Sequence, residues 1–359
     1  MTLEIKKNKI YLIAEIGVNH NGKLHLAKRL IKLAKKSGAD AVKFQNFKAE
    51  KLVTKNAKKA LYQVKNTSKF ETQYKMLKKL ELQEKEFFIL KKYAKKYKID
   101  FLSSAFDHDS VDFLIKKLRL NIIKIPSTEA TNYLTLKKLN FQRYKIILST
   151  GMCKYKDIVL ALNTIAKAKI YELRKRKVII RNKKIYKKLR KKLYLLHCVT
   201  DYPVKDNYAN LDCINNLIKD FKLITGYSDH TKGILASIIS VSKGAKIIEK
   251  HFTLNKKMKG PDHSASLNPK EFLAMSKNLR RYELMAGNGI KKIELCELKN
   301  VNVSKKSIVA STLIEKNHKF TYKNLTTKRP GNGLSPFEIK KIINKRSKKK
   351  FLPDEQIVI

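Results

Sequence analysis

The chain has few cysteines and no long apolar run. Its four cysteines (Cys153, Cys198, Cys213 and Cys296) form no CxxC pair. This spacing excludes a cysteine-based zinc site or a disulfide framework and is typical of reduced thiols. Because no stretch of about 18 apolar residues occurs, we expect no membrane-spanning helix. The N-terminal segment lacks an apolar core followed by a cleavage site, so we expect no signal peptide and a cytoplasmic location.

Acidic residues are also scarce. The 359 residues contain 30 Asp and Glu against 81 Lys and Arg, which gives a formal net charge of +51. Such an excess raises nucleic acid as a partner. However, 70 of the 81 basic residues are lysines spread along the chain, whereas proteins that read bases favour the planar fork of arginine. The charge therefore indicates a lysine-rich solvated surface, and nucleic-acid binding is kept only as the non-enzyme alternative.

Apolar strand patterns alternate with helical patterns over the first 285 residues. The expected strands are Tyr11–Gly17, Ala41–Gln45, Asp100–Phe106, Ile122–Ser127, Lys145–Gly151, Leu193–Cys198, Leu223–Ser228 and Lys246–Phe252. Eight such strands separated by helices predict an α/β fold with a closed (β/α)8 TIM barrel. We expect the barrel over residues 1–285, a linker over 286–303 and a small C-terminal domain over 304–359.

Charged residues lie within or at the end of several apolar strand patterns, namely Glu15, Lys43, Lys124 and Glu249. Serine and threonine at such positions are explained by turn formation. Turn formation does not explain the charges, because an unpaired charge in an apolar run is costly. Since the C-terminal ends of barrel strands converge on one mouth, the pattern predicts a shared active site there.

One segment is unusually basic. Arg174–Lys192 contains 12 basic residues in 19 and no acid. As a helix it would be basic around most of its surface. We interpret it as a solvated insertion before the sixth barrel strand, and a patch for nucleic acid or an anionic membrane is the alternative.

Seven motifs occur in order at the expected strand ends. They are AEIGVNHNG (14–22), VKFQ (42–45), KIPSTE (124–129), ILSTGM (147–152), LLHC (195–198), GYSDHT (226–231) and EKHFTLNKKMKGPDHS (249–264). With them the chain resembles the sialic acid synthase family, which includes N-acetylneuraminate and N,N'-diacetyllegionaminate synthases. The tail, with KRPGNG at 328–333, resembles the family's antifreeze-like SAF domain.

The resemblance implies condensation of phosphoenolpyruvate with an N-acylated amino sugar, releasing phosphate and a nonulosonate. The sugar would be N-acetylmannosamine or a 2,4-diacetamido-2,4,6-trideoxyhexose. A pseudaminate synthase, or another phosphoenolpyruvate-condensing synthase of keto sugar acids, is the alternative enzyme.

Two histidines, His230 and His251, belong to neighbouring strands at the expected mouth. Two imidazoles so placed can hold one divalent cation and leave positions for water and substrate. Two unrelated core histidines would give the same pattern. The resemblance implies that both are metal ligands, with Mn2+ or Mg2+ as the cofactor.

Phosphoenolpyruvate is a trianion and needs fixed cations and hydroxyl donors. Lys43 and Lys124 can supply the charge, and a buried ion pair with Glu15 or Glu249 is the alternative. The resemblance assigns five positions to phosphoenolpyruvate: Lys43, Lys124, Ser127, Ser149 and Ser228.

The remaining roles come from the resemblance alone. It makes Glu15 the catalytic carboxylate during breakdown of the tetrahedral intermediate, and places Gln45, Tyr202 and Asp262 near the sugar. It also sends Arg329 of the small domain into the barrel mouth of a second subunit, which implies a domain-swapped homodimer. A structural arginine that stabilises a Pro-Gly turn is the alternative.

Three residues depart from the family pattern. Thr128 stands where glycine is usual, so its Cβ would crowd phosphoenolpyruvate or forbid a positive φ. Ala105 replaces a usual proline, and Thr200 replaces an asparagine found in some members. None of them removes a residue of the expected chemistry, so we expect an active enzyme.

Overall fold

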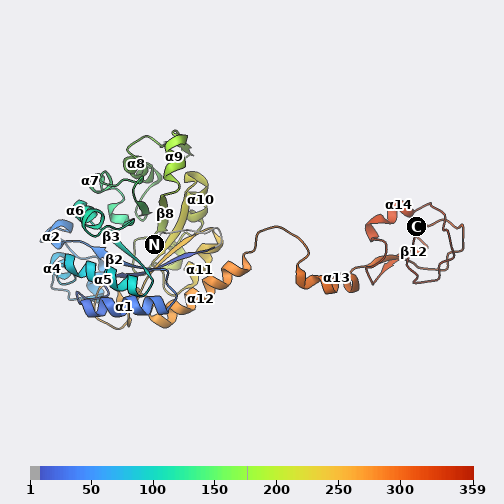
Figure 1. Cartoon of the computed structure of the whole chain (residues 1–359), viewed down its shortest axis with the longest axis horizontal. Helices are drawn as coiled ribbons and strands as arrows, with labels where there is room; N and C mark the ends of the chain where they lie inside the picture. Colours follow the sequence, from blue (N-terminus) through green and yellow to red (C-terminus); the bar gives the residue numbers. More distant parts are fainter. Residues whose placement is uncertain (1–8, 176) are drawn as a thin grey trace. The chain divides into compact units, whose positions relative to one another are not determined.

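The computed structural model describes residues 9–175 and 177–359 (Figure 1). The chain divides into two compact units, of which the first ends at Ala286 and the second spans Gly287–Ile359. The first unit is a closed barrel of parallel strands in the order β1-β10-β9-β8-β5-β4-β3-β2. The predicted (β/α)8 barrel is therefore confirmed.

All eight predicted barrel strands are present, and their ends differ from the prediction by at most two residues. They are β1 (Tyr11–Gly17), β2 (Ala41–Asn46), β3 (Asp100–Ala105), β4 (Ile122–Ile125), β5 (Lys145–Ser149), β8 (Leu193–Cys198), β9 (Ile224–Asp229) and β10 (Ile247–His251). The largest differences are at the ends of β4 and β5, where the predicted strands included the turns that follow them.

The barrel is not evenly closed. Strand β3 pairs with β2 along all six of its residues, and β4 pairs with β5 along Ile122–Ile125. Between β3 and β4, in contrast, the register contains only Ser104 and Lys124. The N-terminal halves of these two strands are therefore not paired with each other.

Helices cover the outside of the barrel (Figure 1). In α1 (Leu24–Lys36), Ala27, Leu30, Ile31 and Ala34 are buried, which is the spacing of one helix face. The other helices of this unit are α2 (Ala49–Leu52), α3 (Leu61–Asn66), α4 (Gln73–Lys78), α5 (Glu84–Lys96), α6 (His108–Asp112) continued by a π-helical turn, η1 (Phe113–Lys117), α7 (Tyr133–Leu136), α8 (Tyr155–Ala166), α10 (Asp212–Phe221), α11 (Leu235–Ser242) and α12 (Pro269–Met285). In the described residues, no helix is long and apolar enough to cross a membrane.

The described residues of the basic segment do not form the single helix that was considered for it. Strands β6 (Tyr171–Arg174) and β7 (Lys177–Ile180) form an antiparallel hairpin, and only α9 (Lys183–Leu189) is helical. The β-branched run at the end of β7 favours a strand. Asn182 then caps α9, because its side chain accepts a hydrogen bond from Ile185 N.

The second unit has a small core of its own. Strands β11 (Ser307–Ala310) and β12 (Leu325–Lys328) pair antiparallel, and α14 (Ile339–Ile342) packs beside them. Ile308, Phe320 and Phe351 are buried in this core. Before it, α13 (Leu298–Ser304) gives helical structure to part of the segment that was expected to be a linker.

Candidate active site at the barrel mouth

Four charged side chains meet inside the barrel near the C-terminal ends of its strands. Glu15, Lys43, Lys124 and Glu249 come from β1, β2, β4 and β10. Each is at most 5% exposed. Side chains alternate between the two faces of a strand, and Glu15 lies beside Lys43 in the strand register. The charges that interrupt the apolar runs therefore share one layer of the barrel interior.

These charges neutralise one another. Lys43 Nζ lies 2.7 Å from Glu15 Oε2 and 3.6 Å from Glu249 Oε1. Lys124 Nζ lies 3.5 Å from the same Glu249 oxygen. The ion pairing considered as an alternative for both lysines is thus present. Because pairing compensates the burial of each charge, all four groups can be held in a dry site.

The two carboxylates have opposite pKa shifts. Burial alone would raise the pKa of Glu249, but Lys124 and Lys43 together hold it at about 2. Burial also acts on Glu15, and there it outweighs the single lysine, so the pKa of Glu15 is raised. Carboxylates whose environments separate their pKa values in this way can take different roles. Glu249 is suited to stay charged, and Glu15 is suited to exchange a proton.

Hydroxyl groups surround the charged cluster. Lys124 donates to Ser149 Oγ and Lys43 donates to Ser104 Oγ, both at 2.8 Å. Ser228 donates to Glu249 Oε1 at 2.9 Å. The sequence analysis assigns Ser104 no role, so its contact with Lys43 at the mouth is one that sequence reasoning missed.

His230 and His251 lie next to each other at this mouth, with ring centroids 5.6 Å apart. His230 Nδ1 lies 2.7 Å from the Val199 carbonyl oxygen, and donation of a proton to it would leave the Nε2 lone pair free. His251 Nδ1 is buried without a hydrogen-bond partner. A buried unpaired ring nitrogen beside a second imidazole fits a metal ligand set.

The two imidazoles are not part of a larger ligand cluster. Within the described part of the chain, no three His, Cys, Asp or Glu side chains are grouped to hold a metal ion. A cation held by His230 and His251 would therefore take its other ligands from water or substrate.

The residues assigned to the sugar divide between the two units. Gln45 Nε2 donates to Glu15 Oε1 at 3.1 Å, and the ring of Tyr202 lies 4.2 Å from that of His230. Burial and then Glu15 raise the pKa of Asp262 to about 7, and its Oδ2 lies 3.9 Å from His251 Nδ1. These three residues belong to the barrel mouth. Arg329 belongs to the second unit, where it is exposed.

The departures from the family pattern are tolerated by the backbone. Thr128 lies in a 3-10 turn (Ser127–Glu129) and does not have a positive φ. Its Cβ therefore causes no backbone strain. Thr128 and Ser127 both line the cavity at the barrel mouth, whose wall also contains the four charged side chains. Ala105 ends β3 beside Asn46. Thr200 Oγ1 is buried in the cavity wall without a hydrogen-bond partner, so it is free to bind a ligand.

A second buried ion pair supports His230 from the other face of the sheet. Lys250 Nζ lies 2.9 Å from Asp229 Oδ2 and donates to the Thr231 carbonyl oxygen. Asp229 Oδ1 accepts from Thr231 N at 2.8 Å. The pair thus fixes the backbone on both sides of His230. Sequence reasoning missed it, although Lys250 interrupts an apolar run just as Lys124 does.

Comparison with known proteins identifies the family. The model of the NeuB family matches residues 30–291. The chain belongs to the NeuB family. The SAF domain model matches residues 305–358, so the expected resemblance is confirmed for both parts of the chain.

Relatives cover nearly the whole chain. An N,N'-diacetyllegionaminic acid synthase of Campylobacter jejuni is 46% identical over 97% of this chain and 99% of its own length. The enzyme of the same name from Legionella pneumophila is 41% identical over 94% and 90%. A crystal structure of N-acetylneuraminic acid synthetase from Leptospira borgpetersenii, 29% identical, covers 82% of this chain and 90% of that chain with a TM-score of 0.65.

Proposed function

We propose that the chain condenses phosphoenolpyruvate with an N-acylated amino sugar to form a sialic-acid-type nonulosonate and phosphate. The observation that carries the proposal is the buried cluster of Glu15, Lys43, Lys124 and Glu249 at the mouth of a NeuB-family barrel. C3 of phosphoenolpyruvate attacks the sugar aldehyde, water adds at C2, and phosphate leaves with cleavage of the C–O bond. The enzyme is expected to act in the cytoplasm.

Lys43 and Lys124 bind the charged groups of phosphoenolpyruvate, with hydroxyl contacts from Ser127, Ser149 and Ser228. In the free site both lysines already face carboxylates, so a trianion needs further positive charge. The raised pKa of Glu15 supports one way to provide it, because protonation of Glu15 removes one of the two carboxylate charges that face Lys43. Glu15 then accepts or returns a proton at the C2 hydroxyl group as the tetrahedral intermediate breaks down.

His230 and His251 hold the divalent cation, Mn2+ or Mg2+. When bound, the cation acts as a Lewis acid on the aldehyde oxygen. The orphan Nδ1 of His251 and the Val199 contact that orients His230 support this assignment. Asp229 and Lys250 are positioning residues for His230.

Gln45, Tyr202 and Asp262 bind the sugar, and Arg329 of a second subunit contacts its acylamino group. Exposed apolar side chains at the end of α12 and in the segment that follows it support a homodimer, because such residues ordinarily pack against a partner. They include Leu284, Met285, Ile290, Leu295 and Leu298. An Arg329→Ala variant should raise KM for the sugar by about tenfold, with little change for phosphoenolpyruvate. Equal changes in both KM values would contradict this role.

We further propose a 2,4-diacetamido-2,4,6-trideoxyhexose as the acceptor, since the relatives from Campylobacter jejuni and Legionella pneumophila are both named N,N'-diacetyllegionaminic acid synthases. Phosphate release should be measured with phosphoenolpyruvate, Mn2+ and a panel containing this sugar, N-acetylmannosamine and the pseudaminate precursor. The fastest release is expected with the legionaminate precursor. Faster release with another sugar would correct the acceptor, and no release with any sugar from folded protein would refute the function.

A further inference from the structure

A second cavity lies at the opposite end of the barrel from the mouth. It has a volume of about 470 Å3. We call it the β3–β4 pocket, and it is lined by Phe88, Lys91, Lys92, Lys95, Ile99, Asp100, Phe101, Arg119, Leu120, Asn121 and Ile122. Asp100 begins β3 and Ile122 begins β4. Since Ser104 lies four residues further along β3, the pocket is roughly 13 Å from the layer of the active site.

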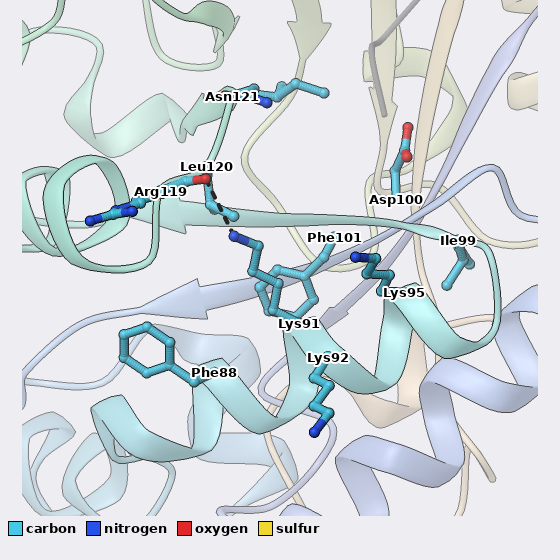
Figure 2. A pocket seen from close by; sticks show the side chains of 11 residues that line it. Phe88, Lys91, Lys92, Lys95, Ile99, Asp100, Phe101, Arg119, Leu120 and Asn121 are labelled. Atoms are coloured by element: carbon cyan, nitrogen blue, oxygen red, sulfur yellow. Dashed lines mark hydrogen bonds between the residues drawn. The ribbon is translucent and has the colours of Figure 1, made fainter.

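The uneven closure of the barrel accounts for this pocket. Strands β3 and β4 pair only at Ser104 and Lys124, so their N-terminal halves leave an opening. Helix α5 and the turn before β4 line its sides, and Figure 2 shows Phe88 and Phe101 at the wall with Lys91 between α5 and this turn. Lys91 connects the two sides by donating to the carbonyl oxygens of Leu118 and Arg119 at 2.7 and 3.3 Å.

The wall of the pocket combines an apolar surface with unneutralised positive charge. Phe88, Phe101, Leu120 and Ile122 supply the apolar part. The cations are Lys91, Lys92, Lys95 and Arg119, and among the described residues none of the four has an acidic side chain within ion-pair distance.

The wall also contains one acid, Asp100, which keeps its negative charge but forms no ion pair with the four cations. Asp100 Oδ2 accepts a hydrogen bond from Tyr11 Oη at 2.8 Å, inside the base of the barrel. Burial lowers the pKa of Lys91, and the like charges of Arg119 and Lys95 lower it further. Lys91, Lys95 and Arg119 therefore repel one another, and an anion bound beside them would relieve this repulsion.

General lysine enrichment does not account for this arrangement. Solvated lysines extend from a convex surface, and their charge is screened by water and salt. Here the cations line a hollow of ligand size, and two phenyl rings belong to the same wall. Cavities with an apolar wall and a few convergent polar groups are the usual sites of small ligands.

We propose that the β3–β4 pocket binds a small aromatic anion, with its ring between Phe88 and Phe101 and its carboxylate, sulfonate or phosphate group at Lys91, Lys95 and Arg119. The site is separate from the barrel mouth. Its ligand therefore differs from phosphoenolpyruvate, which has no apolar ring.

The test uses the full chain and the fluorescent aromatic sulfonate 8-anilino-1-naphthalenesulfonate. Wild-type protein should bind it saturably at one site, and Lys95→Glu combined with Arg119→Glu should weaken binding by at least about tenfold. The matched control combines Lys85→Glu with Lys96→Glu. It changes the net charge of the protein by the same amount, at two positions of α5 that do not line the pocket. Thermal unfolding verifies that each variant is folded.

The control should bind within about twofold of wild type, because screened surface charges contribute little. Equal weakening in both double variants, or none in the pocket variant, would overturn the proposal. Competition experiments show whether the pocket requires the aromatic ring of the ligand in addition to its charge. Phenyl phosphate or benzoate should displace the probe, and inorganic phosphate should not. Displacement by phosphoenolpyruvate would place the probe at the mouth and would also overturn the proposal.

Discussion

The two ends of the barrel hold positive charge in opposite ways. At the mouth, Lys43 and Lys124 are buried and each faces Glu249 within 3.6 Å. At the base, Lys95 and Arg119 line a cavity and form no ion pair within the described part of the chain. Charge at the mouth is paired and rigid, as catalysis requires. Charge at the base is unpaired within the described residues, which suits the proposed binding of an anion.

The largest effect is expected when one partner of the buried charge pairs at the mouth is removed. Lys124→Met leaves Glu249 with less compensation in a dry site, which should destabilise the fold by about 3 kcal/mol or more. It also removes a proposed phosphoenolpyruvate contact, so kcat/KM should fall by at least about 1,000-fold. Urea unfolding and phosphate release measure the two effects.

The control for this variant is Lys219→Met, which removes an exposed lysine of α10. It should change the free energy of unfolding by less than about 0.5 kcal/mol. Near-wild-type stability and activity of the Lys124 variant would show that the paired charge at the mouth is not essential.

The proposed metal site should respond next. His251→Ala removes one of two protein ligands, so Mn2+ affinity measured by calorimetry should fall by about 100-fold or more. The exposed His25 provides the matched control, and His25→Ala should bind Mn2+ as the wild type does. Full Mn2+ affinity in the His251 variant would refute the assignment.

A pH effect should appear in the first loop of the mouth. Burial lowers the pKa of His20 to about 4, and Gly22 N donates to its Nδ1. Between pH 6.5 and 4 the unfolded chain therefore takes up a proton that the folded chain does not. Stability is lost as pH falls through this range, by about 3 kcal/mol.

Replacement of this imidazole should remove its share of the loss. His20→Gln should reduce the fall in unfolding free energy between pH 6.5 and 4 by about 3 kcal/mol, measured by urea unfolding at each pH. The fall that remains comes from other buried histidines, such as His263, whose pKa burial also lowers to about 4. His25→Gln should keep the slope of the wild type. An unchanged slope in the His20 variant would show that the imidazole is protonated in the folded state.

The smallest effect is expected from the basic hairpin and α9. Lys183, Lys184, Lys187 and Lys188 of this helix belong to a segment that we interpret as a solvated insertion. Replacing all four by glutamine should change phosphate release by less than about twofold at physiological salt. A clear loss of salt-dependent RNA binding in the same variant would instead support the nucleic-acid alternative.

Much of the fold and part of the site could be predicted from the sequence. The barrel strands are recognisable because each is a short apolar run, and charges such as Glu15 and Lys124 are conspicuous inside such runs. An ion pair of Lys43 or Lys124 with Glu15 or Glu249 could be expected from the sequence, but which carboxylate faces which lysine could not, because that depends on how the strands converge across the barrel. The β3–β4 pocket depends on the limited pairing between β3 and β4, which local composition does not reveal.

The central claim is that the paired charges of the mouth handle phosphoenolpyruvate with cleavage of its C–O bond. The most direct test supplies phosphoenolpyruvate labelled with 18O in the bridging oxygen, together with Mn2+ and the acceptor sugar. Mass spectrometry should find the label in the released phosphate, because water supplies the new oxygen at C2. Label retained in the sugar acid would mean that the P–O bond breaks, and it would contradict the account.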